Sequence, residues 1–166
     1  SGLAVAREMS SNGGERTVLN ASGYVTARRA ATASSKVTGK VIEVLIEEGM
    51  KVKEGQVLAR LDDTNVKANL NVAQAQLESA KQGVGETAAQ LKQAEAEFQR
   101  TAELSQQSIA SQSDLDSAEA NAKTFRARLA RQQSDVIVAE RQVEMWQQQL
   151  DDLIIRAPFA GIVTTK

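Results

Sequence analysis

The chain has 166 residues, enough for one ordinary domain, and a formal net charge of −1. It contains no histidine and no cysteine, which excludes a thiolate nucleophile, a Ser-His relay, the usual zinc sites and a disulfide framework. The near-neutral charge argues against a nucleic-acid-binding protein, because such proteins carry a strong basic excess. Alanine contributes 26 residues and aromatic side chains only 3%, so the composition favours closely packed helices over a thick globular core.

Residues 31–63, which follow an N-terminal segment of 30 residues, are expected to form short strands. The β-branched run from Val41 to Ile46 is followed by Gly49 and Gly55, six residues apart, and this pattern predicts small strands joined by tight turns. No apolar run approaches the roughly 20 residues that a membrane-spanning helix needs. The chain opens with Ser1-Gly2 and not with Met, so we expect any leader or anchor to have been removed.

Residues 64–152 are expected to form a long α-helical hairpin. Apart from Gly83 and Gly85, this stretch lacks glycine and proline and is rich in Ala, Gln, Glu and Leu. Its apolar residues recur every seventh position in two sets, which is a strong coiled-coil signal. The expected seam between the two helices consists of Leu70, Leu77, Val84, Leu91, Phe98, Leu115, Phe125, Leu129, Val136, Val143, Trp146 and Leu150. Companion positions three residues further on include Ala73, Ala80, Thr87, Ala94, Thr101 and Gln132.

The break between the two helices is expected near residues 107–111. Ser111 and Asp114 have the spacing of a capping box and predict the start of the second helix. A turn this short permits only an antiparallel hairpin, with arms on the order of 65 Å at 1.5 Å per residue. Folding about residue 110 brings Leu91 near Leu129, although a slip of half a heptad remains open. The two glycines are either a tolerated weak point or a hinge.

Residues 153–166 look like the start of a second copy of the first β region. Thr38-Gly39-Lys40-Val41 and Ala160-Gly161-Ile162-Val163 are similar. A small β-sandwich that carries the hairpin as an insertion explains this repeat. The predicted fold is therefore α+β, with a long antiparallel coiled-coil hairpin inserted into a split β-sandwich. Counterparts of Gly49 and Gly55 are missing after Gly161, so we expect the chain to be a piece of a longer protein.

The β segments resemble a known family. The pattern Gly39-x-Val41-x-x-Val44-x-Ile46, continued by glycines at 49 and 55, resembles one half of a lipoyl-type sandwich, and the segment 155–163 resembles the second half. Split lipoyl halves around a heptad hairpin are similar to the periplasmic adaptor subunits, the HlyD-like membrane fusion proteins of tripartite efflux pumps and type I secretion systems.

The resemblance implies a non-enzymatic connector without a cofactor, located in the periplasm of a Gram-negative bacterium and associated with the inner membrane through parts absent from this chain. Its implied partners are an inner-membrane transporter of the ABC, RND or MFS type, a TolC-like outer-membrane channel, and copies of itself in a ring, usually a hexamer. Residues 1–30 would then contain one early strand of a membrane-proximal domain, around Thr17 to Val25.

The resemblance also suggests a docking motif at the hairpin tip. Arg100, Leu104 and Ser111 match the spacing by which such adaptors engage the helical end of a TolC-like channel. Arg100 offers several hydrogen-bond donors in one plane, Leu104 an apolar side chain, and Ser111 a helix cap. Without the resemblance, the same residues would read as a surface charge, the last core leucine and an N-cap. Alanines off the seam fit lateral packing between hairpins, or helix propensity alone: Ala75, Ala89, Ala96, Ala120 and Ala127.

Three other functions each account for part of the sequence. A coiled-coil scaffold unrelated to export explains the heptads but not the paired β halves. A covalent carrier would need its modified lysine at a hairpin, whereas Met50-Lys51 lies in the other turn. A catalytic acidic pair is conceivable among Asp62, Asp63, Asp151 and Asp152, although the first two suit the start of a helix.

Overall fold

A computed structural model of the chain describes residues 4–9, 16–17, 24–25, 27–33 and 39–165. They form two compact units: one combines residues 1–67 with residues 148–166, and the other consists of residues 68–147. The first unit contains all the described strands, and the second contains most of two long helices. Neither helix is long and apolar enough over the described residues to cross a membrane.

The β unit consists of small antiparallel sheets whose strands come from both sides of the helical insertion. A four-stranded sheet has the order β4 (Ala27–Ala33), β1 (Ala4–Met9), β9 (Gly161–Thr165), β6 (Lys51–Val52). A three-stranded sheet has the order β5 (Val41–Val44), β7 (Val57–Leu61), β8 (Ile154–Arg156). Because β7 pairs with β8, and β6 with β9, the segments before and after the helices complete common sheets. The predicted split sandwich is confirmed.

The core of this unit is small and uses residues from both segments. Val52, Leu58, Ala157 and Val163 are buried together, and Ala33, Ile46 and Ile155 pack against them. The predicted tight turns lie at Gly49 and Gly55, whose φ angles of 83° and 77° favour glycine. Their amides donate across the segments to the carbonyls of Val163 (2.8 Å) and Ala157 (2.9 Å). The turns therefore also join the two halves.

The N-terminal segment contributes strands that the sequence patterns did not predict. β1 pairs with both β4 and β9, which places parts of the first 33 residues in the four-stranded sheet of the sandwich. The strand expected around residues 17–25 lies mostly outside the described residues. Its described parts belong to β2 (Arg16–Thr17) and β3 (Tyr24–Val25), which pair with each other.

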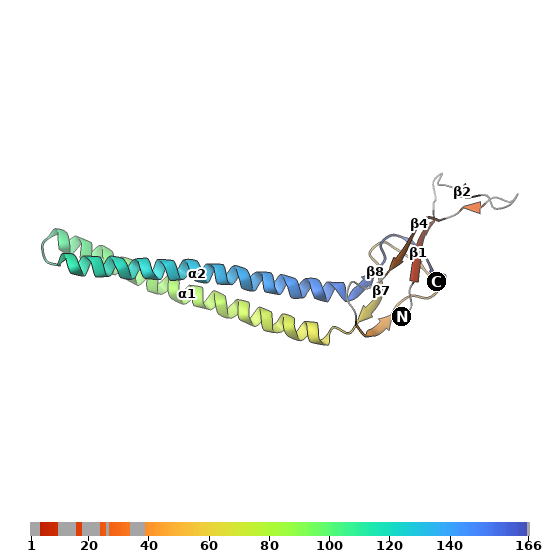
Figure 1. Cartoon of the computed structure of the whole chain (residues 1–166), viewed down its shortest axis with the longest axis horizontal. Helices are drawn as coiled ribbons and strands as arrows, with labels where there is room; N and C mark the ends of the chain where they lie inside the picture. The colour runs from red at the N-terminus through yellow and green to blue at the C-terminus, as the bar shows by residue number, and fades with distance from the viewer. Residues whose placement is uncertain (1–3, 10–15, 18–23, 26, 34–38, 166) are drawn as a thin grey trace. The chain divides into compact units, whose positions relative to one another are not determined.

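The two helices form the predicted antiparallel hairpin. α1 (Thr64–Gln106) and α2 (Gln112–Asp152) run side by side (Figure 1). An ion pair between Arg126 Nη2 and Glu95 Oε1 (2.7 Å) joins them directly. Further from the turn that joins the helices, one groove is lined by residues of both: Lys81 and Val84 of α1, and Gln133 and Val136 of α2. The α+β fold with an inserted hairpin is thus confirmed.

Small residues occupy the most buried positions of the hairpin. In α1, Ala73 (1% exposed), Thr87, Ala94 and Thr101 are buried, whereas the larger residues Leu77, Val84, Leu91 and Phe98 are only half-buried. In α2 the same is true of Ala122, which is 2% exposed. The short side chains let the helix backbones approach, and the larger side chains then cover the edges of the contact. Every position of the expected seam in the two helices is buried or half-buried.

A polar side chain interrupts this seam opposite Gly83. Gln132 of α2 is half-buried, and its Oε1 atom is buried without a hydrogen-bond partner among the described residues. A Cβ atom added at Gly83 would lie 3.8 Å from Gln132 Nε2, an ordinary contact distance. The glycine is thus tolerated beside the glutamine but is not sterically required by it. A buried carbonyl oxygen without a partner costs roughly 1–3 kcal/mol.

We predict that Gln132→Leu stabilises the hairpin. The change removes the unpaired oxygen and adds apolar contact, so the free energy of unfolding should rise by about 1 kcal/mol. Thermal unfolding followed by circular dichroism measures this. Gln133→Leu is the matched control, because Gln133 is exposed. Equal melting temperatures for the two variants would contradict the assignment of an energetic cost to Gln132 Oε1.

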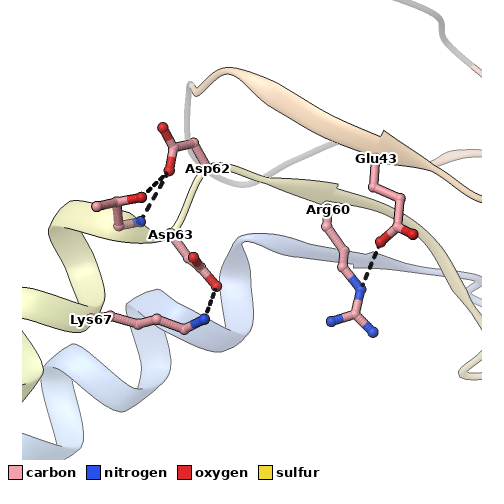
Figure 2. A network of polar contacts seen from close by, with 6 residues as sticks. Glu43, Arg60, Asp62, Asp63 and Lys67 are labelled. Carbon is pink, nitrogen blue, oxygen red and sulfur yellow. Dashed lines mark hydrogen bonds and ion pairs between the residues drawn. The ribbon is translucent and has the colours of Figure 1, made fainter.

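Carboxylates fix the start of α1 (Figure 2). Asp62 Oδ1 accepts hydrogen bonds from the backbone N–H of Thr64 (3.0 Å) and from its hydroxyl (2.8 Å). The backbone carbonyl of Asp63 accepts the first helical N–H, from Lys67, and the Asp63 carboxylate pairs with the Lys67 ammonium at 2.8 Å. Nearby, Arg60 Nε lies 3.4 Å from Glu43 Oε2 across β5 and β7. These contacts agree with the interpretation that Asp62 and Asp63 serve the helix start.

The cap formed by Asp62 should make stability depend on pH. The hydrogen bonds from the Thr64 backbone and hydroxyl, aided by the charge of Lys40, lower the pKa of Asp62 below its ordinary value. Because the folded pKa is the lower one, the ionised carboxylate stabilises the fold above the unfolded pKa of about 3.9. That contribution is lost as the pH falls through the folded pKa. Asp62→Asn should therefore destabilise the chain at pH 7 and become nearly neutral at the acid end of the range. Chemical denaturation at pH 7 and at the acid end of the range measures the difference in unfolding free energy between the parent and Asp62→Asn. A constant difference would contradict this role.

Candidate functional site

The hairpin tip is a short loop between α1 and α2 whose backbone amides are hydrogen-bonded within the chain. Ser108 has a φ angle of 59°, in the left-handed region, which reverses the chain after α1. The amide of Ser108 donates to the carbonyl of Ser105 (3.0 Å), and the amides of Ile109 and Ala110 donate to that of Leu104 (2.9 and 3.3 Å). The loop amides are thus satisfied within the chain, and the loop has a defined shape without a partner.

The second helix begins with the predicted capping box. The Ser111 amide donates to Asp114 Oδ2 (3.3 Å), and the Asp114 amide donates to Ser111 Oγ (3.0 Å). The amide of Leu115 donates to the Ser111 carbonyl (3.1 Å), which starts the helical ladder. This reciprocal pair fixes the direction in which α2 leaves the loop. The turn lies where the sequence predicted it.

The three proposed tip residues have different surroundings. Arg100 is exposed on α1, and its Nη1 atom lies 2.6 Å from Glu97 Oε2, three residues before it. Leu104 is half-buried, and its backbone carbonyl accepts hydrogen bonds from the amides of Ile109 and Ala110. The Ser111 side chain is engaged in the cap. Leu104 and Ser111 thus flank the loop, while Arg100 precedes it by more than a turn of helix and points its charge to a carboxylate on its own helix.

The sequence reasoning missed the most exposed apolar side chain near the tip. Ile109, at the centre of the loop, is 67% exposed, although isoleucine is among the residues most often buried in proteins. Its signal in the sequence was a lone β-branched apolar residue in a run of Ser, Gln and Ala, outside both heptad patterns. An apolar residue that no heptad explains is a candidate contact residue.

The described residues offer no support for the alternative sites. Asp151 lies 3.7 Å from Arg156 Nη2, and Asp152 accepts a hydrogen bond from Gln148, so these carboxylates have structural partners, as Asp62 and Asp63 do. Within the described ranges, no group of three or more His, Cys, Asp or Glu side chains is placed to hold a metal ion. Lys51 is the first residue of β6 and pairs with Ile162 in the sheet.

Comparisons with known proteins agree with the class that this fold defines, a barrel-sandwich protein carrying a helical hairpin. Residues 29–166 match the family described as RND MFP, barrel-sandwich hybrid domain. The chain therefore belongs to the RND membrane fusion protein family, which confirms the resemblance drawn from the sequence. It is 30% identical over 148 residues to the multidrug resistance protein MdtA of Escherichia coli, a match that covers 89% of this chain and 32% of MdtA. The chain thus spans about a third of the length of that relative.

Solved structures show the same fold at low sequence identity. MacA from Actinobacillus actinomycetemcomitans aligns with a TM-score of 0.75 and 23% identity over 96% of this chain and 44% of its own. The membrane fusion protein Spr0693 from Streptococcus pneumoniae aligns with a TM-score of 0.59 and 18% identity over 98% of this chain and 52% of its own. These likenesses support the architecture of strands and hairpin.

The capping box yields a prediction about the tip itself. Ser111→Ala removes the acceptor of the Asp114 amide and should lower the free energy of unfolding by about 1 kcal/mol. Ser111→Thr should retain most of the stability, because threonine also caps. Urea denaturation followed by circular dichroism measures both. Ser113→Ala, an exposed serine in the same turn, is the control. If Ser111→Ala and Ser113→Ala unfolded at the same urea concentration, the cap would contribute nothing to the free energy of unfolding.

Proposed function

We propose that this chain is part of a non-enzymatic periplasmic adaptor that links an inner-membrane transporter to a TolC-like outer-membrane channel. Family membership carries the proposal: residues 29–166 match membrane fusion proteins, and the related MdtA is a multidrug resistance protein. The exported substrates are then drugs or other substrates of such pumps. The adaptor acts in the periplasm of a Gram-negative bacterium at the inner membrane, and the transporter is of the ABC, RND or MFS type.

The hairpin tip is the proposed contact with the channel. Arg100, Leu104 and Ser111 are the residues we assign to it. Leu104 and Ser111 support the proposal by shaping a loop whose amides are already satisfied, so that docking requires little ordering of the chain. Arg100 supports it with exposed guanidinium donors that remain beyond the contact to Glu97.

Lateral packing of hairpins supports assembly into a ring, for which we propose six copies. The alanines off the seam are all exposed in the single chain, where solvent-facing helix positions usually carry charged or polar side chains: Ala75, Ala89, Ala96, Ala120 and Ala127. Each of these residues lies five positions after a heptad residue of its own helix, on the side opposite the seam: Leu70, Val84, Leu91, Leu115 and Ala122. Small side chains there would let neighbouring helices approach as closely as α1 and α2 do.

The function is tested by export in a strain that lacks the chromosomal gene. Full-length protein should restore resistance to toxic compounds, and Arg100→Ala should reduce it without altering the helical signal in circular dichroism. Ser111 is unsuitable for this test, because its replacement also removes the helix cap.

The matched control is Arg141→Ala. Arg141 pairs with Glu144 at 2.9 Å, three residues away on an exposed helix face, as Arg100 pairs with Glu97. We expect Arg141→Ala to export normally. Equal export by the two variants would overturn the role of Arg100, and failure of the unaltered protein to restore resistance would favour a scaffold unrelated to export.

A further inference from the structure

The tip loop presents one large apolar side chain to solvent. Ile109 is 67% exposed, the highest value among the large hydrophobic residues of the part of the chain that the structure describes. Single exposed apolar residues are common on protein surfaces. Ile109 differs in its position, because it stands at the centre of the turn where the hairpin ends, between Ser108 and Ala110.

The backbone holds this side chain in a defined place. The Ile109 amide donates to the Leu104 carbonyl at 2.9 Å, and the left-handed conformation of Ser108 immediately precedes it. Fixing the residue on a closed loop lowers the entropy lost when a partner buries it. Ile109 has no role in the seam, since the heptad positions lie outside the loop.

The surroundings of Ile109 are polar but uncharged. No residue from Leu104 to Ser113 is ionisable, and the nearest charges along the chain are Glu103 and Asp114. The Asp114 carboxylate is engaged by the Ser111 amide. The exposed polar residues next to the isoleucine along the chain are Ser and Gln: Gln106, Gln107, Ser108, Ser111, Gln112 and Ser113. An apolar centre with a polar rim is the usual anatomy of a protein–protein contact.

We infer that Ile109 is the apolar anchor of the tip and inserts into an uncharged apolar pocket at the end of the channel's helices. This inference rests on the proposed function and specifies the chemistry of its partner. The seryl and glutaminyl rim suits the polar backbone groups found at helix ends, which need hydrogen bonds and no counter-charge. Charge–charge attraction is then a minor part of the contact, and Arg100 lies outside its centre.

Two features of binding follow from an apolar anchor. Affinity should change less than about threefold between roughly 0.05 and 0.5 M salt, because exposed charges contribute little. Ile109→Ser should weaken binding by about tenfold to a hundredfold, the equivalent of losing one buried isoleucine side chain. Ile109→Leu should bind within a few-fold of the parent, since it preserves the apolar volume.

The test is surface plasmon resonance of the full-length adaptor on an immobilised, detergent-solubilised TolC-like channel of the same organism. Val138→Ser is the matched control, because Val138 is 66% exposed on α2, away from the loop. The inference is supported if Ile109→Ser alone loses affinity and the parent binds independently of salt. It is overturned if Ile109→Ser binds like Val138→Ser, or if affinity falls steeply with salt.

Two further outcomes separate the inference from the proposed function. Absence of parent binding at every salt concentration would overturn the proposed function itself. Sedimentation equilibrium of the parent and of Ile109→Ser tests whether Ile109 instead contacts a second copy of the chain. Self-association that disappears in Ile109→Ser, without any loss of channel binding, would show that the side chain serves contact between copies, and would overturn the inference.

Discussion

The close approach of α1 and α2 is the constraint on which the hairpin depends. Ala73, Ala94 and Ala122 are almost completely buried, whereas Leu77, Leu91 and Phe98 of the seam are only half-buried. Short side chains at the contact bring the backbones together, and the longer ones extend the buried apolar surface over its edges. A chain with so few aromatic residues obtains its rigidity in this way, from length and close packing and not from a thick core.

The β unit also lacks a thick core, and it is stabilised in a different way. Its buried core is small, and it is built from segments separated by the whole hairpin, so neither segment has a core of its own. The turns at Gly49 and Gly55 join the segments through hydrogen bonds to Val163 and Ala157. Insertion of a long element between β7 and β8 is compatible with this arrangement because the ends of the insertion are held by those two paired strands.

The sequence predicted the features that depend on local rules. Heptad spacing identified both helices, and the Ser111–Asp114 spacing located the turn, because caps and periodicity are encoded within a few residues. β1 and β4 were missed, since β1 is placed by pairing with β9, more than a hundred residues away, and β4 by pairing with β1. The exposure of Ile109 and the pairing of Arg100 with Glu97 were also missed, because side-chain surroundings depend on the actual course of the loop. Among the companion positions of α1, Ala73, Thr87, Ala94 and Thr101 are buried more deeply than Leu77, Leu91 and Phe98, a ranking that heptad spacing does not give.

The central claim is that a hairpin of this construction meets an outer-membrane channel through its tip. A cryo-electron microscopy map of the full-length protein bound to that channel tests it most directly. The account predicts density for residues 107–110 against the helical ends of the channel, with the sides of α1 and α2 contacting neighbouring copies. A complex in which the channel contacts the sides of the helices or the β unit, with the tip loop in solvent, would contradict it.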